Sequence, residues 1–151
     1  MAFKINILLS LVLVFAVPLI VNVFIWNVGD AAGWSSQTPY DYTYWSMGIS
    51  FLVGDDSLRF VYDSNTTNVL EVTSTNYMSC NTTSPLAAYN TGNDTIPITK
   101  EGYQYFISGN SVECNNGLKV GIWASNSSYV RFWRYDPAFG PDGYINVPDF
   151  D

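Results

Sequence analysis

Histidine is absent from this sequence: none of its 151 residues is one. A chain without imidazole lacks the base of a Ser–His–Asp triad and the commonest nitrogen ligand of transition metals. Asp55 and Asp56 are adjacent carboxylates in a turn-like sequence, which does not separate them as an acid and a base acting on one bond. The sequence therefore predicts that the protein is not an enzyme and has no catalytic residue and no cofactor.

Charged residues are also scarce in this sequence. Charged residues form 13% of the chain, and 13 Asp and Glu outnumber six Lys and Arg, so the net charge is −7. Because nucleic-acid binding requires a basic surface, no nucleic-acid partner is expected. Hydrophobic residues form 48% of the chain, which is enough for the core of one domain. With 17% aromatic residues and abundant Asn, Ser and Thr, the composition fits an extracellular β-domain better than a cytosolic enzyme.

The N-terminus is typical of an exported protein. Lys4 supplies a short positive region, and Ile7–Val21 is an apolar run interrupted by Ser10 and Pro18. The run is shorter than the roughly 20 residues that span a membrane, and its length fits the apolar region of a secretory signal peptide. We therefore expect residues 1–23 to be a signal peptide, with an uncleaved membrane anchor as the alternative.

Cysteine is also scarce, with two residues in the chain. In an exported protein this pair predicts one disulfide, Cys80–Cys114, closing a loop of roughly 35 residues and stabilising the fold by about 3–4 kcal/mol. Two free thiols in a reducing compartment are the alternative. Sequons for N-glycosylation favour export over that alternative. They are found at Asn65, Asn81, Asn93 and Asn126.

Alternation of apolar and polar side chains predicts strands. The clearest case is Tyr103–Val120, which we interpret as a strand, a tight loop over Gly109–Gly117 rich in Gly and Asn, and a second strand. One face of the second strand is apolar and carries Leu118, Val120 and Ile122.

Shorter segments of the same kind precede this hairpin. The expected strands are Phe24–Val28, Phe51–Val53, Leu58–Tyr62, Asn68–Thr73, Leu86–Tyr89 and Thr95–Thr99. In the fourth, Leu70 and Val72 are expected to point inward, and a short helix is expected over Thr75–Cys80. Strands spaced by roughly 8–12 residues and separated by Gly, Asn and Asp turns are the pattern of a β-sandwich.

Residues 24–124 form the expected domain, and residues 125–151 form a C-terminal extension. Within the extension, Tyr129–Tyr135 packs aromatic residues around two arginines. We interpret it as an edge strand, because charged residues discourage edge-to-edge pairing; a segment whose arginines stack on polymer groups is the alternative. The Pro- and Gly-rich remainder is expected to be disordered. A GPI-anchor signal needs an apolar C-terminal run of about 10–20 residues, and the ending NVPDFD lacks one.

Short motifs occur in an order that resembles one known family. They are Val28-Gly29-Asp30, Gly33-Trp34, Phe51-Leu52-Val53-Gly54-Asp55, Phe60-Val61-Tyr62, Asn68-Val69-Leu70-Glu71-Val72, Tyr77 with Cys80, Thr91-Gly92-Asn93-Asp94, and Gly102 with Tyr105-Phe106-Ile107. Together they resemble the plant phytocyanin (plastocyanin-like) domain, over roughly residues 24–124. The resemblance implies an all-β, cupredoxin-like Greek-key β-sandwich of two sheets, with Cys80 and Cys114 at the family's disulfide positions.

Copper-binding phytocyanins hold the metal with two His, one Cys and one Met or Gln. The resemblance places these ligands at Thr67, Ser108, Glu113 and Leu118 of this sequence. A type 1 copper site needs imidazole nitrogens and a thiolate, which none of these four residues supplies. The pattern looks like the early nodulin-like branch of the family, which keeps the fold and lacks the metal. That branch is implied to act at the outer plasma membrane or cell wall, where it binds or moves carbohydrate or organises receptors and wall polymers.

Two groups of residues are candidates for ligand binding. Thr67, Ser108 and Glu113 are expected to meet near Leu118, where they form either a pocket for a sugar hydroxyl or a set of side chains that satisfy one another. The second group is either an exposed surface for a sugar or a protein partner, or a lid over the sandwich. It comprises Tyr40, Tyr42, Tyr44 and Trp45.

These observations together predict a secreted glycoprotein of the extracellular space (apoplast) or of the outer face of the plasma membrane. We expect it to act as a copper-free phytocyanin-like binding module for wall carbohydrate or cell-surface proteins, or to transport carbohydrate. A type 1 copper electron carrier is an alternative that the missing ligands disfavour. A purely structural wall glycoprotein is the other alternative.

Overall fold

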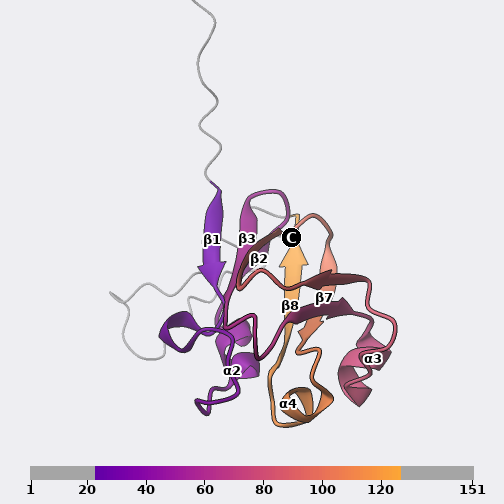
Figure 1. Cartoon of the computed structure of the whole chain (residues 1–151). Coiled ribbons are helices and arrows are strands. Elements are labelled where there is room, and N and C mark those ends of the chain that lie inside the picture. The colour runs from indigo at the N-terminus through magenta and orange to yellow at the C-terminus, as the bar shows by residue number, and fades with distance from the viewer. Residues whose placement is uncertain (1–22, 127–151) are drawn as a thin grey trace, which may run out of the picture.

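Two β-sheets packed face to face make up the domain (Figure 1). The computed structural model describes residues 23–126. The expected signal peptide, residues 1–23, and the expected extension, residues 125–151 with Tyr129–Tyr135, lie almost wholly outside the described part. Within residues 23–126, no helix has the length and apolar character needed to cross a membrane.

The smaller sheet has three strands in the order β1-β3-β6. Strand β1 (Phe24–Asn27) runs parallel to β3 (Asp56–Val61), and β3 pairs antiparallel with β6 (Asn93–Pro97). Alternation decides which side chains of β3 face the core: Leu58 and Phe60 are fully buried, whereas Val61 is exposed. The expected strand over Leu58–Tyr62 is therefore confirmed, with its bounds at Asp56–Val61.

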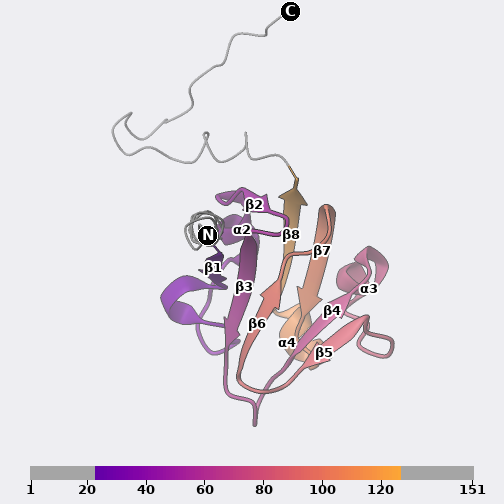
Figure 2. The same cartoon turned by 90° about the horizontal axis from the view of Figure 1, so that it is seen from above.

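The larger sheet has five strands in the order β2-β8-β7-β4-β5. They are β2 (Phe51–Leu52), β8 (Lys119–Ser125), β7 (Gly102–Ile107), β4 (Val69–Val72) and β5 (Ala87–Tyr89). Strands β7 and β8 pair antiparallel, as the hairpin pattern predicts, and β2 joins β8 in parallel. Figure 2 shows β1, β3 and β6 as one layer and β8, β7, β4 and β5 as the other.

The main core lies between the two sheets. Phe60 of the smaller sheet meets Phe106 of the larger one with ring centroids 5.3 Å apart, and the indole of Trp34 packs edge-on against Phe60. Leu118, Val120 and Ile122 all belong to this cluster, so the predicted apolar face of the second hairpin strand is confirmed. Helix α2 (Tyr42–Met47) and the 3₁₀ turn η1 (Asp30–Ala32) lie in the long connection between β1 and β2.

A second, smaller core lies on the outer face of the larger sheet. Helix α3 (Ser74–Ser79) supplies its cover, and the Cys80–Cys114 disulfide closes it. Leu70 and Val72 are buried here rather than between the sheets, because their neighbour Val69 takes the inward position on β4. The predicted disulfide is confirmed.

One predicted loop contains a helix. Residues Ser111–Asn115 form α4, inside the segment Gly109–Gly117 that the composition indicates as a tight loop. The Asn110 side chain begins this helix by accepting hydrogen bonds from the backbone N–H groups of Val112 and Glu113. The sequence pattern was therefore wrong about this segment, since an Asn that favours turns also caps helices.

Candidate functional site

The structure brings together the four residues that the resemblance places at ligand positions. Thr67 precedes β4, Ser108 directly follows β7, Glu113 lies in α4 and Leu118 precedes β8. The backbone N–H of Ser108 donates to the carbonyl of Leu118 at 3.0 Å, and the N–H of Leu118 donates to the carbonyl of Glu113 at 2.9 Å. Ser108 and Leu118 are buried. These positions therefore form one cluster at the end of the sandwich.

The polar side chains of this cluster are satisfied within the protein. The Ser108 hydroxyl donates to Oε2 of Glu113 at 2.7 Å, and the Thr67 hydroxyl donates to the same oxygen at 2.8 Å. The other oxygen of Glu113, Oε1, accepts a hydrogen bond of 2.8 Å from the hydroxyl of Ser36. Three hydroxyls from three separate segments therefore converge on one carboxylate, which we call the Glu113 network.

The electrostatics of the Glu113 network favour a charged carboxylate. Burial by itself raises the pKa of Glu113, but the hydrogen bonds from Ser108, Thr67 and Ser36 outweigh that effect. The pKa of Glu113 therefore lies below its ordinary value. Ser36 was not predicted as a member, because it lies 77 residues from Glu113 in the sequence.

Hydrogen bonds made by Asn68, next to the network residue Thr67, hold the same loops together. The side-chain oxygen of Asn68 accepts a 2.7 Å hydrogen bond from the backbone N–H of Gly109. The backbone carbonyl of Asn68 accepts one of 3.0 Å from the indole N–H of Trp34. A Cβ on Gly109 would lie 2.2 Å from the Asn68 side-chain oxygen, so a larger residue here would displace the side chain that accepts the hydrogen bond from Gly109. The connection before β4 and the connection after β7 are thus fixed to each other.

The residues of the cluster do not fit a type 1 copper ion. Two hydroxyls, one carboxylate and one aliphatic chain provide neither imidazole nor thiolate, and the whole sequence contains no histidine. Both cysteines of the chain are joined in the disulfide. Among residues 23–126, no group of three or more His, Cys, Asp or Glu is placed to hold a metal ion.

The second candidate group divides between core and surface. Tyr42 and Trp45 are buried in the main core, and the Tyr42 hydroxyl donates to the carbonyl of Gly33 at 2.7 Å. Tyr40 packs against this cluster and donates a hydrogen bond to Asp30; burial first and this hydrogen bond second raise the pKa of Tyr40 to about 12. Tyr44 remains 79% exposed. The interpretation as a lid is confirmed for Tyr42 and Trp45 and is wrong for Tyr44.

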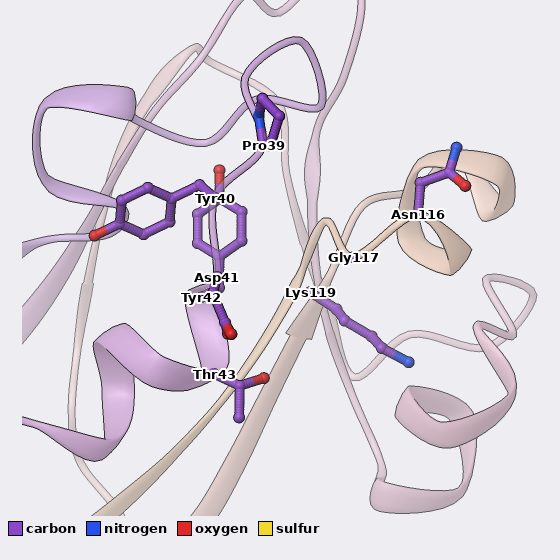
Figure 3. A pocket seen from close by; sticks show the side chains of 8 residues that line it. All are labelled: Pro39, Tyr40, Asp41, Tyr42, Thr43, Asn116, Gly117 and Lys119. Carbon is purple, nitrogen blue, oxygen red and sulfur yellow. The ribbon is translucent and has the colours of Figure 1, made fainter.

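A groove of about 480 Å³ lies between the start of α2 and the start of β8 (Figure 3). One wall is the segment Pro39–Thr43, and the other consists of Asn116, Gly117 and Lys119. Its lining includes hydroxyl, amide, carboxylate and ammonium groups beside aromatic rings. The sequence points to Tyr40 and Tyr42 but not to the second wall, because two loop residues and one strand residue carry no pattern that pairs them with α2.

An aromatic face covers part of the outer surface of the larger sheet. We use this name for Tyr77, Tyr103, Tyr105 and Trp123. Tyr103 is 64% exposed and Trp123 is 53% exposed, and the two lie directly opposite each other on β7 and β8. Alternation along Tyr103–Ile107 contains part of this signal, but the pairing with Trp123 depends on the register of β8.

The four sequon asparagines are all exposed at the surface: Asn65, Asn81, Asn93 and Asn126. The Asn81 side-chain oxygen accepts hydrogen bonds from the backbone N–H and the hydroxyl of Thr83, and the Asn126 amide donates to Glu101 at 3.0 Å. All four asparagines are therefore accessible to solvent in the folded domain, as N-glycosylation requires.

Replacing Glu113 by Gln tests the network. We expect the free energy of unfolding at pH 7 to fall by roughly 1–2 kcal/mol, because a neutral amide oxygen accepts weaker hydrogen bonds than a carboxylate. Since folding lowers the pKa of Glu113, this stabilisation is complete above the unfolded pKa and is lost as the pH falls through the folded pKa. Urea denaturation at pH 7 and at acidic pH should show the two proteins converging in acid.

The matched control for this substitution is Glu101→Gln, which changes an exposed carboxylate outside the network. We expect it to shift stability little at either pH. A Glu113→Gln protein as stable as the wild type at pH 7 would contradict the assigned role of the carboxylate.

Comparison with known proteins agrees with this geometry. The family model described as the plastocyanin-like domain matches residues 34–118. Stellacyanin of Toxicodendron vernicifluum is 41% identical over 102 residues, covering 65% of this chain and 94% of that protein. Early nodulin-like protein 2 of Arabidopsis thaliana is 36% identical over 122 residues, covering 81% of this chain but 34% of that protein. The chain thus spans about a third of that relative.

The solved structures agree in fold as well as in sequence. Cucumber stellacyanin with Cu²⁺ superposes with a TM-score of 0.63 at 30% identity, covering 71% of this chain and 99% of that one. This similarity confirms the cupredoxin-like fold, and the family is one of electron carriers and nodulin-like proteins rather than a typical enzyme family. The matched domain, the two sheets and the disulfide together show that the chain belongs to the plastocyanin-like domain family, as a phytocyanin with early nodulin-like relatives.

Proposed function

We propose that the protein is a copper-free phytocyanin that acts outside the cell as a binding module for carbohydrate. The observation that carries the copper-free part of the proposal is the Glu113 network, in which Thr67, Ser108 and Glu113 bond to one another at the positions that the resemblance assigns to copper ligands. Electron transfer by a blue copper site needs a thiolate and imidazoles, which the cluster does not contain. Function is therefore proposed for the surface and not for the cluster.

Two surface features favour carbohydrate as the ligand. The groove combines the ring of Tyr40 with hydroxyl, amide and charged groups, which are the side chains that hydrogen-bond sugar hydroxyls. The aromatic face offers exposed rings, whose negative faces attract the polarised C–H groups of a sugar. A purely structural wall glycoprotein would need neither feature.

An extracellular location, in the apoplast or at the outer face of the plasma membrane, is proposed on three grounds. The N-terminal sequence has the pattern of a signal peptide, the disulfide suits an oxidising compartment, and the four sequon asparagines are exposed. Wall carbohydrate and cell-surface proteins are the partners available there.

Secretion makes the first prediction of this proposal. Expressed in plant cells, the protein should be recovered from the apoplastic fluid with N-glycans, so that an N-glycosidase lowers its apparent mass. A variant with Asn65, Asn81, Asn93 and Asn126 all changed to Gln should show no such shift. Recovery of unglycosylated protein from the cytosol would contradict the extracellular location.

The second prediction of this proposal concerns copper loading. After incubation with excess Cu(II) and dialysis, we expect no stoichiometric copper and no intense visible band, because the ligand types are missing. The matched variant restores them: Thr67→His, Ser108→Cys, Glu113→His and Leu118→Gln. We expect this variant to take up copper and to show the strong absorbance of a copper–thiolate site. If the wild-type protein turned blue, electron transfer would become the favoured function. If the variant stayed colourless, the ligand positions would be misassigned.

Saccharide binding makes the third prediction. The secreted, disulfide-intact protein should show saturable binding to at least one plant wall glycan on an array. The reason is that the groove and the aromatic face present donors, acceptors and rings in one domain. Absence of any saturable binding would favour the structural alternative.

A further inference from the structure

The aromatic face is a continuous row of rings. The ring centroids of Trp123 and Tyr103 lie 4.8 Å apart, those of Tyr103 and Tyr105 lie 5.8 Å apart, and those of Tyr105 and Tyr77 lie 4.9 Å apart. Trp123 meets Tyr103 edge-on and Tyr103 stacks on Tyr105, so each ring of the row packs against the next. Gly121 makes room for the row, since a Cβ on it would lie 3.2 Å from the Tyr105 ring.

The row leads into the groove. Lys119 places its ammonium 5.0 Å from the centroid of the Tyr77 ring, and Lys119 also lines the groove. Thr43, in the opposite wall of the groove, is close enough to Tyr77 to counter in part the rise in its pKa that burial causes. Figure 3 shows Lys119 and Thr43 on opposite sides of the opening. The exposed Trp123 and the groove are therefore the two ends of one surface.

The charges of this surface favour an uncharged ligand. The groove is lined by one carboxylate, Asp41, and one ammonium, Lys119, so its charges balance. Sugar hydroxyls both donate and accept hydrogen bonds and therefore complement a pair of opposite charges together with the Thr43 hydroxyl and the Asn116 amide. An acidic polymer is disfavoured, because residues 23–126 carry nine Asp and Glu against three Lys and Arg.

We propose that the surface from Trp123, across Tyr103, Tyr105 and Tyr77, to the groove beside Lys119 is the binding site for a linear, uncharged oligosaccharide. This inference rests on the proposed function and specifies its ligand class and its residues. The exposed rings of Tyr103 and Trp123 pack against the sugar chain, Tyr105 and Tyr77 support them from partly buried positions, and the groove receives the sugar at the end of the row. The Glu113 network takes no part in contact with the sugar.

Calorimetric titration of the secreted, glycosylated protein tests the assignment. The probes are uncharged β-1,4-linked hexasaccharides of glucose, mannose and xylose, and the charged hexasaccharide of galacturonic acid. We expect at least one uncharged probe to bind more tightly than the charged one. Tyr103→Ala and Trp123→Ala should each weaken its binding by roughly fivefold or more, the effect typical of truncating a residue that anchors a partner.

The matched control is Tyr44→Ala, which removes an exposed aromatic residue that is not part of the row. We expect it to leave the affinity unchanged. Because all three side chains are exposed, thermal melting should confirm that the variants fold. Thr43→Ala should weaken binding at the groove end of the site.

The outcomes separate this inference from the function on which it rests. Saccharide binding that survives both Tyr103→Ala and Trp123→Ala would overturn the site and leave the function standing. Binding of the galacturonic acid probe alone would overturn the uncharged ligand class. Binding of no saccharide would overturn the function and the site together. Self-association of the protein that Tyr103→Ala and Trp123→Ala abolish would overturn the site by showing that the aromatic face is an interface between copies.

Discussion

The carboxylate of Glu113 is the link on which one end of the sandwich depends. Its two oxygens accept hydrogen bonds from Ser36, Thr67 and Ser108, which belong to three connections that are distant in the sequence. Connections between strands have no regular backbone pairing of their own, so something must hold them in register at the end of a sheet. A copper ion would do this in a phytocyanin with His and Cys ligands. Here a carboxylate and three hydroxyls join these connections by hydrogen bonds.

The second core determines which part of the surface remains available. Helix α3 and the disulfide cover Leu70, Val72 and Ile107 on the outer face of the larger sheet. The helix does not extend over the strands at Tyr103 and Trp123, which stay exposed. Large aromatic side chains are usually buried on folding. Tyr103 and Trp123 remain exposed although the domain has two cores, and an exposed apolar patch of this kind is typical of a binding surface.

The sequence predicted the strands better than it predicted their surroundings. Period-two alternation locates Leu118, Val120 and Ile122 on a buried face because that face has one possible environment, the space between the sheets. Leu70 and Val72 have the same pattern, yet they are buried under α3, and the pattern cannot distinguish a sheet from a helix as the cover. Helix α4 was missed because the composition of Gly109–Gly117 favours turns, whereas the helix begins at the Asn110 cap and contains the disulfide-bonded Cys114. The ligand positions were found through family resemblance, whereas Ser36, Lys119 and Trp123 join their sites only through folding.

The family fold is compatible with a different set of side chains at the copper-ligand positions, because the fold and those positions depend on different residues. The strands and the disulfide require apolar faces, tight turns and two cysteines, none of which involves Thr67, Ser108 or Glu113 as a ligand. Once these positions carry hydroxyls and a carboxylate, the cluster becomes a structural joint whose polar groups are satisfied inside the protein. Any recognition must then use side chains whose atoms still face water, and the aromatic face and the groove supply them. Function in this family is therefore argued from individual sites rather than from the sandwich that carries them.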